Sequence, residues 1–564
     1  MRHILTALFL LLLPVSVMPQ IAVNGHVACY DSLTNTWIAT VPERMFFKDN
    51  ELTISIGSSD SSLQLFRNLC ADSTYTITIT DAQGRANAER LQFTFLPIVQ
   101  LLPPAGTDRS ASPAYFGYEY QPARVLFSHP DSARTDTLTA RVKWRGGTTN
   151  ATGKHKRNYK LNFDEDQRFF GLRDDDKWML DAGQPDVFRL RNRIAMDIWN
   201  RMARKPYYAG QEPKALNGVR GEIVEVFLGD EWRGIYNFSE LMDRKQLKLK
   251  KVDEHTGEIR GCLYKGISWD RTQMFNQIDS YDNTKDVLGG YEFKYPGLGD
   301  DSDTVDWRPL VEANNFAKSS TDEEFRQRVD DYFDMTAVMD YNIFYNVVNA
   351  VDNAGKNMYW AVYDKTKWQR LTPAPWDLDA TFGQRWGGML DIVVDEGHFT
   401  SPEFRLDLEL MLTYRMFKDN PNNYIEQLNE RYRSLRQPGQ PLHTDSLLAL
   451  LTRYYRAVKD SGAAAREEAK WSGDSDVWGD TIDFDAQYAF IYDWIRRRMD
   501  FIDQTEFPLF YKQSYFDAMS INMPAVSATV SGHLYNLGGQ RIGQLSGLRP
   551  GLYIRDGKKI VIGR

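Results

Sequence analysis

Residues 349–383 contain two groups of side chains suited to binding a hard metal ion. Asp352 stands five residues before Asn357, and Asp377 and Asp379 follow after an apolar run. Between these two groups, the segments MYWAVYD and WQRLTPAPW are rich in aromatic and β-branched residues and are joined by the polar turn DKTK. This composition predicts a β-hairpin. Because a hairpin brings its two ends together, we expect the two groups of side chains to meet.

This order of side chains is typical of a centre that transfers a phosphoryl group. In such centres one aspartate accepts the proton of the attacking hydroxyl, and an asparagine and a second aspartate hold magnesium. Carboxylate and amide oxygens are the ligand types that Mg²⁺ prefers. Asp and Asn also favour loops, because their side chains bond to the nearby backbone. The spacing of Asp352 and Asn357 alone is therefore also compatible with a purely structural loop.

Predicted strands elsewhere in the chain carry basic side chains. In TLTARVKWRGG, the alternation of a strand places Arg141, Lys143 and Arg145 on one face. The returning strand NYKLNF carries Lys160, and the strand GCLYKG carries Lys265. Such side chains are suited to meeting phosphate groups. The first two strands lack the G-x-G-x-x-G pattern, so they are also compatible with a basic hairpin exposed to solvent.

Two segments with helical periodicity would position these groups. RNRIAMDIWNRMA has apolar residues at helical spacing but contains no Glu. A lysine–glutamate pair of the kind found in kinases therefore cannot be assigned to this helix, and Glu222, Glu225 and Glu240 remain as alternatives. DMTAVMDYNIFYNVVNA has a wide apolar face and predicts a buried helix that leads directly into Asp352.

Several blocks, in this order, resemble the spore-coat protein H (CotH) kinase family: RGGTT…KHKRNYKLNF, RNRIAMDIW, VEVFLGDEWRGIYNFSE, DNAGKNMYW and PWDLDATFG. The DN…KN and PWDLD blocks are the most specific. The resemblance covers roughly residues 110–508. It implies an atypical, two-lobed protein-kinase-like domain of a secreted or surface protein.

The resemblance also implies roles for individual side chains. ATP would bind between the lobes, and its γ-phosphate would pass to a Ser or Thr hydroxyl of a protein substrate, with Asp352 as the catalytic base or as the group that orients the hydroxyl. Glu240 is the preferred partner of the strand lysine, because it ends the GIYNFSE block, although a surface position is also compatible. The implied ligands are Asn357, Asp377 and Asp379 for Mg²⁺, and Arg145, Lys160, Glu240 and Lys265 for the nucleotide.

The flanking regions predict smaller units. Residues 1–20 combine a short basic start with an apolar run and are typical of a secretory signal peptide. Residues 22–106 contain short alternating runs and predict a small β-sandwich. Within this unit, Cys29 and Cys70 could form a disulfide after export, or all three cysteines of the chain could be unpaired thiols.

The last part of the chain contains two segments with different predicted secondary structure. Residues 402–508 are mostly helical in pattern, and residues 515–564 predict a short β tail of two or three strands with glycine turns. The tail resembles the carboxyl-terminal tails of surface-exported proteins of gram-negative bacteria, including type IX sorting tails. We therefore expect a secreted protein that is periplasmic or located at the outer cell surface.

Taken together, the sequence predicts an α+β protein in which an atypical kinase-like two-lobed domain follows a small β-sandwich and precedes a short β tail. The net charge of −8 is spread along the chain and argues against nucleic-acid binding. No segment beyond the signal peptide is apolar enough to span a membrane. Two other functions remain open, a non-catalytic surface adhesin or scaffold and a glycan-processing protein that uses Asp377 and Asp379 as acid and base.

Overall fold

The computed structural model describes residues 21–56, 60–80, 86–104, 115–132, 135–151, 153–384, 411–477 and 479–507, together with four strands near the C-terminus. The chain divides into two units, Met1–Phe507 and Pro508–Arg564. The expected signal segment and residues 385–410 lie outside the described residues.

The first unit begins with two small sheets. One has the strand order β2-β1-β5-β6 and the other the order β3-β4-β8-β7. Apolar residues of both sheets form one core, as the alternation of the strands predicts. The strands are β1 (Ile21–Val23), β2 (His26–Val27), β3 (Cys29–Asp31), β4 (Thr36–Thr40), β5 (Asn50–Ile56), β6 (Asp60–Phe66), β7 (Tyr75–Thr80) and β8 (Ala86–Thr94).

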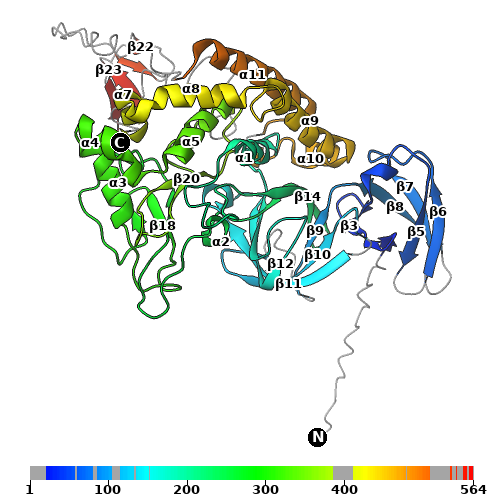
Figure 1. Ribbon diagram of the computed structural model, residues 1–564. Coiled ribbons are helices and arrows are strands. Elements are labelled where there is room, and N and C mark those ends of the chain that lie inside the picture. Colours follow the sequence, from blue (N-terminus) through cyan, green and yellow to red (C-terminus); the bar gives the residue numbers. More distant parts are fainter. Residues whose placement is uncertain are drawn as a thin grey trace. The chain divides into compact units, whose positions relative to one another are not determined.

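A closed barrel follows, with the strand order β10-β11-β12-β13-β15-β14-β9 (Figure 1). Neighbouring strands are antiparallel except for the parallel pair β14 and β9. The strands are β9 (Ile98–Leu102), β10 (Gln121–Ser128), β11 (Thr135–Arg145), β12 (Asn158–Gln167), β13 (Asp175–Asp181), β14 (Gly221–Leu228) and β15 (Glu231–Ser239). The expectation that the sandwich extends to residue 106 is wrong for β9, because this strand closes the barrel.

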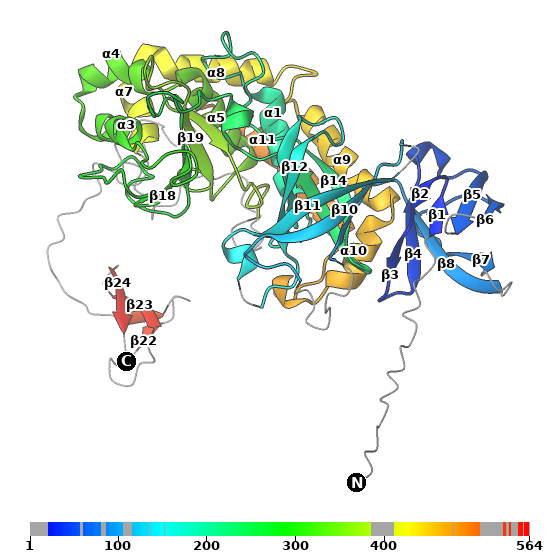
Figure 2. The same cartoon turned by 90° about the horizontal axis from the view of Figure 1, so that it is seen from below.

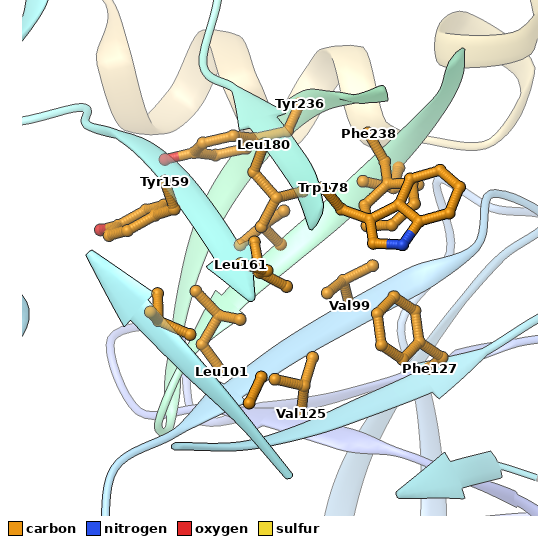
Figure 3. Packing of buried hydrophobic residues seen from close by; sticks show 14 of the residues in the cluster. Val99, Leu101, Val125, Phe127, Tyr159, Leu161, Trp178, Leu180, Tyr236 and Phe238 are labelled. Atoms are coloured by element: carbon orange, nitrogen blue, oxygen red, sulfur yellow. The ribbon is translucent and has the colours of Figure 1, made fainter. Parts of the chain in front are cut away.

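Large apolar side chains fill the barrel interior (Figure 3). Tyr159 and Leu161 of β12 point inward, where they join Trp178 and Leu180 of β13. Because side chains alternate along a strand, Lys160 lies on the outer face. Arg141, Lys143 and Arg145 likewise alternate with the buried Val142. The packing of the barrel therefore directs the row of basic side chains outward.

The rest of the first unit is a five-stranded sheet with helices (Figure 1 and Figure 2). The sheet has the order β17-β18-β16-β19-β20 and consists of β17 (Val287–Leu288), β18 (Tyr291–Tyr295), β16 (Cys262–Gly266), β19 (Met358–Val362) and β20 (Thr372–Pro375). Among the described residues, the helices of four residues or more are α1 (Arg191–Met202), α2 (Arg244–Leu247), α3 (Arg308–Ser319), α4 (Asp322–Tyr332), α5 (Met335–Val348), α7 (Met411–Asp419), α8 (Tyr424–Leu435), α9 (Thr444–Asp460), α10 (Ala463–Trp471) and α11 (Phe484–Thr505).

This mixture of helices and several sheets is the α+β class that the sequence predicted. The predicted helices at residues 191–203 and 334–350 are confirmed as α1 and α5, and the predicted hairpin before Asp377 is confirmed as β19 and β20. Within the described part of the chain, no helix has both the length and the apolar character needed to cross a membrane.

The second unit contains one small antiparallel sheet with the order β22-β21-β23-β24. Its strands are β21 (Leu534–Asn536), β22 (Arg541–Ile542), β23 (Gly551–Arg555) and β24 (Lys558–Ile562). The sequence predicted a β tail of two or three strands, and the sheet has four.

The three cysteines are unpaired thiols. Cys29 and Cys262 are buried, and burial raises the pKa of the Cys262 thiol to about 12. A disulfide between Cys29 and Cys70, one of the two alternatives considered above, is absent.

The barrel core predicts a clear contrast in stability. Leu161 is 0% exposed in the barrel, whereas Leu63 on β6 is 63% exposed. We expect Leu161→Ala to lower the free energy of unfolding by about 2–5 kcal/mol, because it leaves a cavity in a packed core. The control Leu63→Ala should change it by less than about 0.5 kcal/mol. Urea unfolding of both variants measures this, and equal effects would contradict the assignment of the core.

Candidate active site

Helix α5 ends directly before the loop that begins the candidate site. The helix is buried along almost its whole length and ends at Asn349, whose φ of +49° turns the backbone out of the helix. The hydroxyl of Tyr341 donates a hydrogen bond of 2.6 Å to the carbonyl of Asn353. A buried helix thus fixes the start of the loop that carries Asp352, because packed elements hold a site more precisely than free loops do.

Backbone hydrogen bonds join the Asp352 loop to the segment that carries Asp377. The amide of Val351 donates to the carbonyl of Ala380 at 3.2 Å, and the amide of Phe382 donates to the carbonyl of Val348 at 2.9 Å. The β19–β20 pairing, which begins with Met358 opposite Pro375, closes the same end. The hairpin therefore brings the two groups of side chains together, as its sequence predicted.

Asn353 cross-links these two segments from inside. Its side chain is fully buried, and its Nδ2 donates to the carbonyl of Asn357 at 2.8 Å and to the carbonyl of Trp376 at 2.6 Å. The amide of Trp376 in turn donates to the carbonyl of Asn357 at 3.1 Å. One side chain therefore sets the spacing between the residue before Asp377 and the Asn357 backbone.

Asp352 is 6% exposed and accepts three hydrogen bonds from side chains. Trp269 Nε1 donates to Oδ1 at 2.8 Å, whereas Lys356 Nζ and Asn357 Nδ2 donate to Oδ2 at 2.6 Å and 2.9 Å. The carboxylate is thus held in a fixed orientation.

Asn357 and Asp377 both adopt left-handed backbone conformations, with φ of +54° and +57°. Such conformations carry a conformational cost and concentrate at functional sites. Asp377 is open to solvent, and yet burial by the protein around it raises the pKa of its carboxyl. Both observations agree if the side chain is recessed but reached by water. The charge of Asp181 raises this pKa further.

The pKa of the Asp379 carboxyl is raised further than that of Asp377. Burial, followed by the charges of Asp377 and Asp181, holds the pKa of Asp379 well above its ordinary range. The charge of Asp352 acts in the same direction on both. Mutually repelling carboxylates of this kind are stabilised when a cation joins them.

The basic side chains predicted to meet phosphates lie near these carboxylates. Lys265 and Arg145 are the cations that oppose the rise of the Asp377 pKa. The Arg145 guanidinium also lies 4.9 Å from the ring centroid of Trp376. The structure therefore brings Arg145, on the barrel, and Lys265, on the five-stranded sheet, to the same side as the acidic segment.

Lys160 and Lys265 have no ion pair within the described part of the chain. Burial and then the charges of Lys177 and Arg145 lower the pKa of Lys160 to about 8. Burial and then the charge of Arg145 lower the pKa of Lys265 to about 8. The charges of Asp377 and Glu292 oppose this shift at Lys265. An anionic ligand would relieve the repulsion among these cations.

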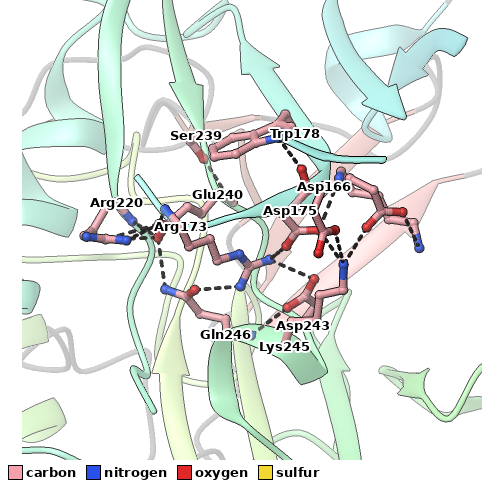
Figure 4. Close-up of polar contacts among 12 residues, drawn as sticks. Asp166, Arg173, Asp175, Trp178, Arg220, Ser239, Glu240, Asp243, Lys245 and Gln246 are labelled. Carbon is pink, nitrogen blue, oxygen red and sulfur yellow. Dashed lines mark hydrogen bonds and ion pairs between the residues drawn. The ribbon is translucent and has the colours of Figure 1, made fainter. Parts of the chain in front are cut away.

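Glu240 does not fill its predicted role as the partner of Lys160. Its buried carboxylate instead forms an ion pair of 2.7 Å with Arg220 (Figure 4). Glu240 also accepts hydrogen bonds from the backbone of Arg173 and from Gln246. Burial alone would raise the pKa of Glu240, but the bonds from Arg220 lower it. The expected pairing fails because two neighbouring arginines satisfy this carboxylate first.

Two residues that sequence analysis missed link the barrel to the acidic segment. Asn192 on α1 donates from Nδ2 to Asp181 Oδ2 at 2.7 Å, and its Oδ1 accepts from the backbone amide of Leu378 at 3.1 Å. Asp181 is the last residue of β13 and adds a further carboxylate near Asp377 and Asp379. Helix α1 therefore contributes to the site through an amide rather than a glutamate.

Groups of three acidic or histidine side chains that could share an ion also occur elsewhere in the described residues. They are His155 with Asp474 and Asp476, and Asp166 with Asp175 and Asp176. In the second group, Lys245 Nζ lies 2.6–3.2 Å from all three carboxylates and already neutralises them (Figure 4). Neither group includes the predicted magnesium ligands.

The residues present fit a magnesium nucleotide. The oxygen donors of Asn357, Asp377 and Asp379 belong to the two joined loops, and the two carboxylates carry a surplus of negative charge. Lys265 and Arg145 lie near Asp377, and Lys160 lies near Arg145, so their positive charges can match phosphate oxygens. This arrangement can bind a metal–phosphate complex next to Asp352.

The Asn192 bridge generates a test. We expect Asn192→Ala to weaken binding of magnesium nucleotide by roughly tenfold, since it frees Asp181 and the Leu378 amide. The control Asn200→Ala removes a hydrogen bond of the same helix to the Val219 carbonyl. Calorimetric titration should show the loss only for Asn192→Ala. Equal losses in both variants would mean that the helix, and not the bridge, determines binding.

Comparison with known proteins identifies a family for this chain. A search of the curated proteins found no match. The family model described as CotH kinase protein matches residues 142–502, which is most of the chain and includes every predicted site residue from Arg145 to Asp379. The chain therefore belongs to the CotH kinase family, and this membership indicates a kinase-like function.

Proposed function

We propose that this protein is a secreted atypical kinase that transfers the γ-phosphate of ATP, with Mg²⁺, to a Ser or Thr hydroxyl of a protein substrate. One observation carries the proposal. Carboxylates with raised pKa values lie near Lys265 and Arg145, and their segment is joined to the loop that carries the fixed carboxylate of Asp352.

Each group has a role in this reaction. Asn357 and Asp377 would hold the metal, and Asp379 would support it or orient Asp377. Bound there, Mg²⁺ would neutralise charge on the phosphate oxygens as the terminal phosphoryl group departs. Lys160 and Lys265 would compensate the remaining phosphate charge, together with Arg145.

Asp352 would take the proton of the acceptor hydroxyl. The acceptor oxygen forms the new bond to the γ-phosphorus, and the bond from that phosphorus to the β–γ bridging oxygen breaks. ADP leaves with the bonding electron pair, and the proton on Asp352 returns to solvent. The fixed orientation of this carboxylate favours the proton transfer, because general bases act only from within hydrogen-bonding distance.

The place of action is proposed from the two ends of the chain. Residues 1–20 have the pattern of a secretory signal peptide, and residues 515–564 resemble a sorting tail. We therefore place the protein in the periplasm or at the outer cell surface, where its substrate would be another secreted or surface protein.

The alternative is a non-catalytic surface adhesin or scaffold that keeps this fold. Two observations favour it. Lys356 Nζ lies 2.6 Å from the Asp352 carboxylate, and Glu240 is not available to Lys160. ATP is also scarce outside the cytoplasm. This alternative predicts that magnesium nucleotide does not bind.

Two variants distinguish the proposed kinase from the non-catalytic scaffold. Asp377→Ala should abolish binding of Mg²⁺–ATP, because it removes a proposed metal ligand. Asp352→Ala should retain binding but lower phosphoryl transfer by at least about a hundredfold, because it removes the base. Calorimetry and a phosphate-transfer assay on the mature protein measure these effects. No metal-dependent binding in a folded wild-type sample would favour the scaffold.

A pH dependence follows from the lysines. The pKa of Lys160 is lowered to about 8, so its charge is present below pH 8 and is lost above it. We expect the affinity for Mg²⁺–ATP to fall between pH 8 and about pH 9.5, since Lys265 titrates in the same range. In Lys160→Arg the fall should be smaller, because arginine keeps its charge. An identical pH profile in this variant would exclude Lys160 from the phosphate site.

A further inference from the structure

We propose that Trp269 is a positioning residue for Asp352 and that Oδ1 of Asp352 is the oxygen that takes the proton of the acceptor. The inference rests on the proposed kinase function and assigns a role to a side chain outside the family-like blocks. It comes from the hydrogen bonds that the two oxygens of Asp352 already make.

The two oxygens of Asp352 are used differently. An ionised carboxylate has about two acceptor positions on each oxygen. Oδ2 accepts from both Lys356 and Asn357, so its positions are filled. Oδ1 accepts only from Trp269 among the described residues, at 2.8 Å. One position on Oδ1 is therefore left for an incoming hydroxyl.

Trp269 belongs to a segment that is fixed against the Asp352 loop. Ahead of it, the amide of Ile267 donates to the carbonyl of Gly290 at 2.8 Å. Behind it, the carbonyl of Thr272 accepts a hydrogen bond from Asn314 Nδ2 on α3 at 2.5 Å. Gly355, in the Asp352 loop, packs closely against this segment. A Cβ atom at this glycine would lie only 3.2 Å from the carbonyl oxygen of Gln273. The residues on both sides of Trp269 are thus anchored, and its indole N–H donates to Asp352.

The exposure of the two partners gives the direction of approach. Asp352 is 6% exposed, whereas Trp269 is 37% exposed. Since Oδ2 is closed off, an acceptor hydroxyl reaches the carboxylate alongside the indole ring. The hydroxyl proton passes to Oδ1, the acceptor oxygen bonds to the γ-phosphorus and the β–γ bridging oxygen leaves with ADP. Trp269 keeps its own N–H and holds Oδ1 in line throughout.

Two substitutions at Trp269 separate its hydrogen bond from its ring. Trp269→Phe keeps an aromatic ring but removes the donor. Trp269→His keeps an N–H at the same bond separation from Cβ as the indole N–H. We expect Trp269→Phe to lower kcat by on the order of tenfold with the KM for Mg²⁺–ATP unchanged, because one hydrogen bond to a charged group is lost. Trp269→His should restore most of kcat.

Trp368→Phe is the matched control. Trp368 is 40% exposed and lies in the turn at the opposite end of the β19–β20 hairpin. We expect this variant to have wild-type kcat and KM. The role of Trp269 is refuted if Trp269→Phe has wild-type kcat, if Trp269→His is as slow as Trp269→Phe, or if Trp368→Phe loses as much activity.

A second readout does not depend on activity. The indole N–H resonance that disappears in Trp269→Phe should shift in Asp352→Asn, since the two groups are hydrogen-bonded. An unshifted resonance would refute the contact. Failure of the proposed function has a different signature, because the wild-type protein would then neither bind Mg²⁺–ATP nor transfer phosphate. A wild-type protein that does both, with Trp269→Phe unaffected, refutes only the role of Trp269.

Discussion

The candidate site depends on the attachment of two loops to each other. The carbonyls of Asn357 and Trp376 both accept from the side chain of Asn353, and without that amide two buried acceptors would lack this donor. The Asn357 carbonyl would keep the Trp376 amide as a donor, but a buried polar group left without a partner costs about 1–3 kcal/mol, so the Asn353 side chain stabilises the joined loops. The left-handed turns at Asn357 and Asp377 are tolerated within this frame. The site therefore depends on the backbone conformation of these loops as much as on its charged side chains.

Like charges repel one another on both sides of the site, carboxylates on one side and cations on the other. Asp377 and Asp379 are crowded with other carboxylates, while Lys160 is crowded with other cations. These two groups do not simply neutralise each other, because each is held by its own element. A metal ion and a polyanion together satisfy both sides, whereas either one alone would leave one side unbalanced. This complementarity is the physical reason for preferring a kinase over a passive scaffold.

Local pattern was enough to predict the hairpin, helix α5 and the meeting of Asp352 with Asp377, because all of them lie close together in sequence. The contact between Trp269 and Asp352 spans 83 residues, and no periodicity reports such a contact. Glu240 was predicted to pair with Lys160 because it ends the GIYNFSE block, but its carboxylate pairs with the nearby Arg220 instead. The strand β9 was placed in the wrong sheet, since a short apolar strand carries no sign of which neighbour it will pair with.

The closed barrel has a consequence for how the folded state depends on its surroundings. Lys143 lies directly opposite Lys160 on neighbouring strands, and closure leaves these strands no free edge along which to change register. Their repulsion therefore cannot be relaxed by a shift of register and is a cost of the native state. A bound polyanion would act as the missing counter-ion of the barrel wall. The protein would then be most resistant to unfolding where that ligand is present, so its lifetime in the folded state would depend on the supply of the ligand.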